Sequence, residues 1–147
     1  MRLWTLVRLT AAVGLAAVVS VTAPTDAGAT PHQKSTLRCS HAQIIAIAVS
    51  GTPTTVTAGQ NESITAIALN CTRQTQTVSE VDETLKPTPC TDATSAPSPD
   101  TFTPKQRVSN TFPIPTSSCP GAWGFKIDLY QGTLLIATAQ TSWTVTT

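Results

Sequence analysis

The chain has 147 residues, a length that allows one domain and leaves little room for a second. Charged residues make up only 12% of the sequence, well below the ~25% that is usual for globular domains, and nine basic residues nearly balance eight acidic ones. The basic residues are scattered, which argues against a nucleic-acid-binding protein, because such proteins need clustered cations to displace counterions.

The N-terminal residues have the pattern of a secretory signal peptide. Arg2 and Arg8 precede an uncharged apolar run from Leu9 to Val21, and small residues follow. A membrane-spanning helix needs ~20 apolar residues, and this run is shorter. We therefore expect residues 1–29 to be removed, no membrane association after cleavage, and a mature protein that is secreted into the extracellular space with a flexible polar lead-in over residues 30–41.

The mature chain would contain four cysteines: Cys39, Cys71, Cys90 and Cys119. An even number of cysteines in a short exported chain is typical of a disulfide framework. No Cys-x-x-Cys motif occurs, and Cys39 with His41 is the only close pair of cysteine and histidine, so a metal site is not expected. Four cysteines allow three pairings, and their number alone does not choose among them.

The first half of the mature chain contains strand signals separated by turn signals. Ile44–Val49 is a short apolar run that ends in a Ser-Gly-Thr-Pro turn signal, and Thr54–Thr57 is a short continuation. Ile64–Cys71 alternates between two faces, one of which is interrupted by a polar asparagine. Gln74–Glu83 predicts a further strand that is mostly polar.

The stretch Pro87–Pro120 differs in composition, since it holds eight of the eleven prolines. Proline lacks the N–H that a sheet interior requires, and it confines strands to edges or short pieces. We expect a loop over Thr91–Asp100 and short edge strands at Thr101–Thr103 and Arg107–Phe112.

The C-terminal third predicts a long β-hairpin. Apolar residues alternate with mixed residues from Trp123 to Tyr130, and Gln131-Gly132 can form a two-residue loop because glycine tolerates positive φ. That loop would place Leu129 opposite Leu134 and, two residues further from the turn, isoleucine opposite isoleucine.

Together these signals resemble the immunoglobulin-like domains that are common in exported bacterial proteins. The resemblance is carried by Ile44–Val49, by Gly51-Thr52-Pro53 with Gly59-Gln60, by Ile64–Asn70 and by Gly121–Phe125 with its hairpin. It implies an all-β fold, an immunoglobulin-like antiparallel β-sandwich of about seven strands over residues 42–147. The chain departs from antibody-type domains, because no pair of mid-strand cysteines brackets a tryptophan.

The resemblance also implies a disulfide pairing. In an immunoglobulin-like topology, Cys39 before the first strand and Cys71 after the second would lie at one end of the sandwich. Cys90 and Cys119 would lie at the opposite end. Because a disulfide needs Cα atoms within about 7 Å, the implied pairs are Cys39–Cys71 and Cys90–Cys119.

No catalytic residue, metal ligand or cofactor is predicted. The only histidines are His32, in the lead-in, and His41, at a strand start where a surface position is expected. Glu80, Asp82 and Glu83 form the only acidic cluster, and Glu80 and Asp82 are expected on the solvent face of a strand, with acid–base chemistry or calcium binding in the cluster as the alternative.

We expect a secreted, non-enzymatic module for extracellular interaction or structure, whose partner is an unknown extracellular protein or surface polymer. No ligand-binding residue can be named from the sequence. The alternative is a secreted inhibitor or small-ligand binder that acts through the Cys90–Cys119 loop, because a rigid loop loses little entropy on binding. Trp143 is expected in the core, with a carbohydrate-binding platform as the alternative.

The predicted signal peptide has two candidate cleavage positions. Cleavage after Ala23 would make Pro24 the first mature residue, which we expect to fit a peptidase poorly because proline has a fixed φ and no N–H. Cleavage after Ala29 should therefore dominate, and N-terminal sequencing of secreted protein should begin at Thr30. Recovery of intact Met1 from the medium would contradict the signal-peptide prediction.

Overall fold

A computed structural model describes residues 37–117 and 119–147. The predicted signal peptide and most of the predicted lead-in lie outside the described residues. Within the described residues the chain forms nine strands and no helix, so no helix there is long and apolar enough to cross a membrane. The strands are β1 (Ile45–Thr52), β2 (Thr55–Thr57), β3 (Asn61–Asn70), β4 (Gln76–Leu85), β5 (Ala93–Thr94), β6 (Ser98–Phe102), β7 (Arg107–Pro115), β8 (Gly121–Gln131) and β9 (Leu134–Thr146).

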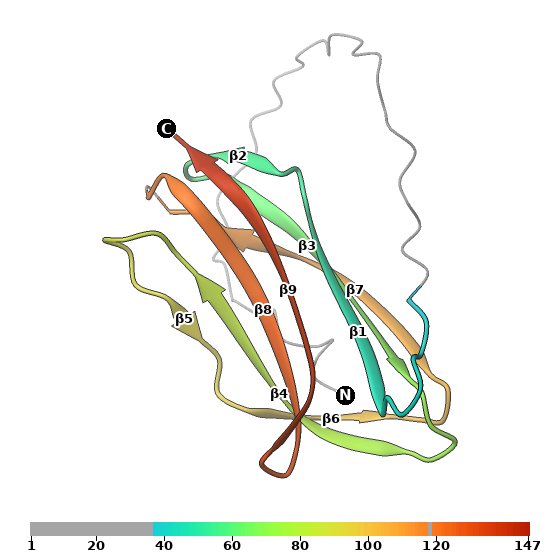
Figure 1. Ribbon diagram of the computed structural model, residues 1–147. Helices are drawn as coiled ribbons and strands as arrows, with labels where there is room; N and C mark the ends of the chain where they lie inside the picture. Colours follow the sequence, from blue (N-terminus) through green and yellow to red (C-terminus); the bar gives the residue numbers. More distant parts are fainter. Residues whose placement is uncertain (1–36, 118) are drawn as a thin grey trace, which may run out of the picture.

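The strands form two sheets that pack face to face (Figure 1). One sheet has three strands in the order β1-β3-β7, and the other has six, in the order β2-β9-β8-β4-β5 with β6 also paired to β4. Neighbouring strands are antiparallel except β2, which runs parallel to the end of β9. The predicted fold class, an immunoglobulin-like β-sandwich stapled by disulfides, is confirmed.

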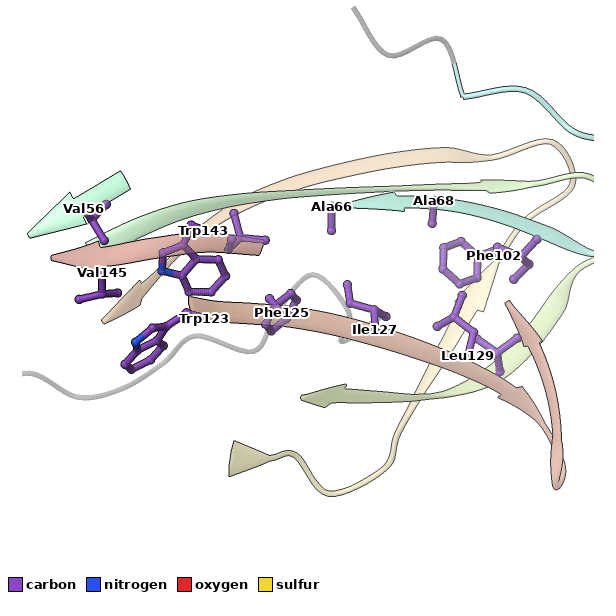
Figure 2. Packing of buried hydrophobic residues seen from close by; sticks show 13 residues of the cluster. Val56, Ala66, Ala68, Phe102, Trp123, Phe125, Ile127, Leu129, Trp143 and Val145 are labelled. Atoms are coloured by element: carbon purple, nitrogen blue, oxygen red, sulfur yellow. The ribbon is translucent and has the colours of Figure 1, made fainter. Parts of the chain in front are cut away.

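The alternation of β8 supplies the centre of the core. Trp123, Phe125, Ile127 and Leu129 are each at most 3% exposed, because every second side chain of a strand points to the same face of its sheet. Figure 2 shows Ile127 pointing across toward Ala66 of β3. Small residues on β3 thus leave room for the larger side chains of β8, which favours close packing of the two sheets.

The polar interruption of β3 is a fully buried side chain, Asn70, whose amide closes one end of the sandwich. Its Nδ2 lies 2.8 Å from the carbonyl of Gln74, 3.1 Å from that of Phe102 and 2.9 Å from that of Thr103. Its Oδ1 accepts a hydrogen bond from the backbone N–H of Thr72. Asn70 therefore ties the end of β3 to the following turn and to the end of β6, and it satisfies polar groups that burial would otherwise leave unpaired.

The proline-rich stretch contains more β-strand than its composition predicts. The predicted loop over residues 91–100 is wrong, because it contains β5 and the first residues of β6. The strand that begins at Arg107 continues to Pro115 rather than ending at Phe112. These strands lie at sheet edges, with β7 paired only to β3 and β6 only to β4, and an edge strand tolerates the missing N–H of proline.

The hairpin between β8 and β9 is present, but its predicted register is wrong. The turn is Gly132-Thr133, with Gly132 at a φ of 63°, so Gln131 pairs with Leu134. The register then shifts at a bulge, because Tyr130 pairs with Leu135 and Leu129 with Ala137. The expected pairing of Ile127 with Ile136 is also wrong, since Ile127 pairs with Ala139. A bulge inserts one unpaired residue, and the alternation of apolar residues does not reveal it.

Two disulfides close the opposite ends of the sandwich. Cys39 is bonded to Cys71 with a Cα–Cα distance of 5.5 Å, next to the start of β1 and the end of β3. Cys90 is bonded to Cys119 with a Cα–Cα distance of 6.4 Å, next to the end of β4 and the start of β8. These pairs are the ones that the resemblance implies.

Removing either disulfide should destabilise the fold by a similar amount. The bonded cysteines are 32 and 29 residues apart, so loop-closure entropy predicts a loss of about 3–4 kcal/mol for each pair of Cys→Ser substitutions. Urea unfolding of the C39S/C71S and C90S/C119S variants measures the loss. Non-reducing peptide mapping of the wild-type protein is the control, and a peptide linking Cys71 to Cys119 as the main species would contradict the topology.

Candidate functional site

A groove of about 320 Å³ opens on the outer face of the six-stranded sheet, near the Cys90–Cys119 end. This volume lies at the lower end of the range of about 300–1,000 Å³ that is usual for small-ligand sites. The groove is lined by Leu85, Lys86, Ala122, Trp123, Gly124, Gln140, Thr141 and Ser142.

The floor of the groove exists because small residues of β8 and β9 lie side by side, with Leu85 of β4 at their edge. Gly124 of β8 pairs with Leu85 of β4 on one side and with Ser142 of β9 on the other. A Cβ at Gly124 would lie only 3.3 Å from the carbonyl oxygen of Thr141 and 3.4 Å from Leu85, so this position has little room for a side chain. Glycine therefore leaves the sheet surface open at this point, and Ala122, two residues earlier on the same face, adds little bulk.

Lys86 forms one wall of the groove and is held against an aromatic ring. Its Nζ lies 5.6 Å from the centroid of the Trp123 ring, a cation–π distance. Trp123 is itself 2% exposed, and its Nε1 donates a hydrogen bond of 2.9 Å to the carbonyl of Cys119. The disulfide-bonded end of the sandwich thus positions the indole, and the indole positions the lysine.

The two tryptophans of the hairpin belong to the core. Trp123 and Trp143 are cross-strand partners whose ring centroids lie 6.2 Å apart. Trp143 is only 3% exposed, so it presents no face to a sugar from solution. The expectation of a core position for Trp143 is confirmed, and the carbohydrate-platform alternative is wrong.

The lysines on this outer face have different electrostatic surroundings. Lys126 makes ion pairs with Glu83 at 2.8 Å and with Asp128 at 3.2 Å, and these two carboxylates raise its pKa. Lys86 has no ion pair within the part of the chain that the structure describes. The carboxylate of Asp92 accepts a hydrogen bond from the backbone N–H of Lys86 and not from its ammonium group. Among the described residues the ammonium group of Lys86 therefore has an aromatic partner, Trp123, and no carboxylate partner.

Two acids of the predicted cluster, Glu80 and Asp82, lie on the inward face of β4, so their assignment to the solvent face is wrong. Glu80 pairs with Leu129 and Asp82 with Ile127, and directly paired residues share a face of the sheet. Glu80 is therefore 3% exposed, next to Asp100 of β6, which is 1% exposed. The polar composition of β4 predicted that these acids face solvent. Pairing with Leu129 and Ile127 of β8 instead turns Glu80 and Asp82 inward. Glu83 is on the outer face, where it pairs with Lys126.

The protonation of Glu80 and of Asp82 depends on burial and on the neighbouring carboxyl groups. Burial, a hydrogen bond from Glu80 to Asp100 and the charge of Asp82 raise the pKa of Glu80 to about 11. Burial also raises the pKa of Asp82. At neutral pH Glu80 is thus a neutral acid whose single O–H can donate one hydrogen bond to a neighbouring carboxyl group. No group of three His, Cys, Asp or Glu side chains in residues 37–117 and 119–147 is arranged to hold a metal ion.

One further buried acid, Glu62 of β3, was not singled out by the sequence analysis. It is fully buried, neither of its carboxyl oxygens has a hydrogen-bond partner within residues 37–117 and 119–147, and burial raises its pKa. A Cβ at Gly51 would lie 2.6 Å from its Oε1, so the glycine makes room for the carboxyl. The alternation of β3 could have identified it, since it shares the inward parity of Ile64. His41 is exposed, and His32 lies outside the described residues.

No family model matches this sequence, and no curated protein matches it. Solved structures with a similar fold include the CARDB domain of a Pyrococcus furiosus protein in complex with di-metal ions. It has a TM-score of 0.54 and 12% identity, and the match covers 69% of this chain and 87% of that one. An alkylpurine DNA glycosylase from Pseudomonas fluorescens, bound to DNA that contains an abasic site analog, has a TM-score of 0.54 and 7% identity over 71% of this chain.

A mutant β-glucosidase from Listeria innocua in complex with laminaribiose is also similar, with a TM-score of 0.52 and 9% identity over 70% of this chain. The match spans 31% of the DNA glycosylase and 16% of this β-glucosidase, so only a part of each enzyme resembles the chain. At these identities the likeness shows the fold alone.

The buried acids predict that the protein is more stable in mild acid than in alkali. A raised pKa means that the folded state keeps a proton that the unfolded chain releases above about pH 4.5. The stability that these groups contribute is complete below that pH and falls as the pH rises, by up to about 1.4 kcal/mol per pH unit for each proton. Urea unfolding between pH 5 and pH 9 should show this slope.

The Glu80→Gln variant should reduce that slope, because glutamine keeps a donor and does not ionise. Its stability at pH 9 should exceed that of the wild type. Glu83→Gln on the outer face is the matched control and should keep the wild-type slope. A wild-type stability that rises from pH 5 to pH 9, or an equal slope in E80Q, would show that the buried acids are not proton-linked.

Proposed function

We propose that the chain is a secreted, non-enzymatic immunoglobulin-like module that binds an extracellular partner through the groove on the outer face of β4, β8 and β9. The observation that carries this proposal is the groove itself, which combines a floor without large side chains at Gly124 with Lys86, whose ammonium group has no carboxylate partner among the described residues. A site of this kind, at the end of a rigid sandwich that a disulfide closes, is preorganised for binding.

The positions of the ionisable groups support a role in binding rather than in catalysis. Glu80 and Asp100 are closed off inside the sandwich at 3% and 1% exposure, so a substrate cannot reach them. The groove is lined by a lysine, an amide and hydroxyl groups, and no histidine or carboxylate lies among its lining residues to act as a general base.

The signal-peptide pattern and the two disulfides support an extracellular location, because disulfides persist in oxidising compartments. The alternative of an inhibitor that acts through the Cys90–Cys119 segment has less support. That segment is not a free loop, since it forms β5, β6 and β7 and contributes to both sheets. If the protein binds a small ligand, the groove is the better candidate site, because its lining residue Trp123 is bonded to the carbonyl of Cys119.

Filling the groove should abolish partner binding. Ser142 is exposed on β9, and Ser142→Tyr would place an aromatic ring over the floor at Gly124. Immobilised wild-type protein should retain at least one component of spent culture medium or of cell-surface polymer that S142Y does not retain. The matched control is Ser109→Tyr on the exposed face of β7.

Mass spectrometry and sugar analysis of the retained material provide the readout. Equal retention by wild type, S142Y and S109Y would contradict the groove as the binding site. A hydrolytic activity of the purified protein on that material would contradict the non-enzymatic role.

A further inference from the structure

We infer that the groove binds a carboxylated sugar, a uronic acid that is either free or part of an acidic polysaccharide. This inference rests on the proposed function and adds to it the chemical class of the ligand. Three properties of the groove support this ligand class: its charge, its hydrogen-bonding rim and its floor.

The charge of the groove selects an anion. Lys86 is the only charged residue among the lining residues, and its ammonium group has no carboxylate partner within the described residues. The nearby Lys126 is already neutralised by Glu83 and Asp128. A ligand carboxylate can therefore form a charge-assisted hydrogen bond with Lys86 without displacing an existing ion pair.

The rim of the groove selects hydroxyl groups. Gln140 and Ser142 are exposed, and their side chains make no hydrogen bond to another described residue. They lie two residues apart on β9, so they point to the same face at a spacing of about 7 Å. An amide and a hydroxyl at that spacing can each bond a hydroxyl of one sugar ring. A simple fatty acid would leave both groups without a partner.

The floor of the groove fits the C–H face of a sugar ring. Ala122 and the buried Gly124 place no side chain larger than a methyl group on the floor, and Leu85 borders it on the β4 side. The indole of Trp123 does not act as the platform, because it is 2% exposed and Lys86 lies over it. The site therefore differs from an aromatic sugar platform, and its preference should depend on charge.

Titration of the ¹⁵N-labelled mature protein tests the inference. Galacturonate should shift the amide resonances of Ala122, Gly124, Gln140 and Ser142 and should bind at least about tenfold more tightly than galactose, its neutral counterpart. Lys86→Gln should remove that difference, whereas Arg73→Gln, an exposed cation outside the groove, should keep it. Ser142→Ala should weaken both sugars, and thermal melting should show that each variant is folded.

Two further probes distinguish the sources of the ligand. Co-sedimentation with polygalacturonate that exceeds the affinity for galacturonate would support a polymer, and equal affinities would support a free sugar. Acetate that binds as tightly as galacturonate would overturn the inference in favour of an adventitious ion only. A peptide with a free C-terminal carboxylate that binds more tightly would also overturn it.

Failure of this inference is distinguishable from failure of the proposed function. If no uronic acid binds and S142Y still abolishes partner retention, the ligand class is wrong and the groove remains the binding site. If galacturonate binds without dependence on Lys86, the inference fails.

Discussion

The structure depends on the burial of one face of β8. Trp123, Phe125, Ile127 and Leu129 fill the space between the sheets, and β8 is also the strand to which both β4 and β9 pair. The face that β8 presents to the core therefore decides the face of its neighbours. The groove and the acidic cluster are both consequences of this single alternation, because residues paired across strands must share a side of the sheet.

On the outer side the alternation places the small residues of β8, of which Ala122 is exposed and Gly124 is buried. Gly124 and Ala122 open the groove, while Trp123 between them anchors the same stretch to the carbonyl of Cys119. Along β8, side chains that pack in the core thus alternate with residues that line the groove. If the groove binds as we propose, its place on a paired strand of the sandwich favours preorganised recognition.

On the inner side the same pairing places acids where a core would normally be apolar. Glu80, with its pKa raised to about 11, stays neutral at pH 7, so it adds no negative charge beside Asp82 and Asp100. The buried pair of Glu80 and Asp100 is closed to solvent and lies in the core. It affects how stability depends on pH, and the outer face remains free for binding.

The sequence by itself determined the features that are local. The alternation of β8 defined a half-buried strand, the number of cysteines defined two disulfides, and the turn residues divided the chain into strands. Only the tertiary structure decided which way Glu80 and Asp82 point, because that depends on pairing with Ile127 and Leu129, which are distant in the chain. The groove could not be predicted from the sequence either. Leu85, Gly124 and Ser142 come from three separate strands and are brought together only by the register of the sheet. A bulge of one residue changes that register without altering the pattern of apolar residues, and this is why side-chain alternation predicted the strands and not their partners.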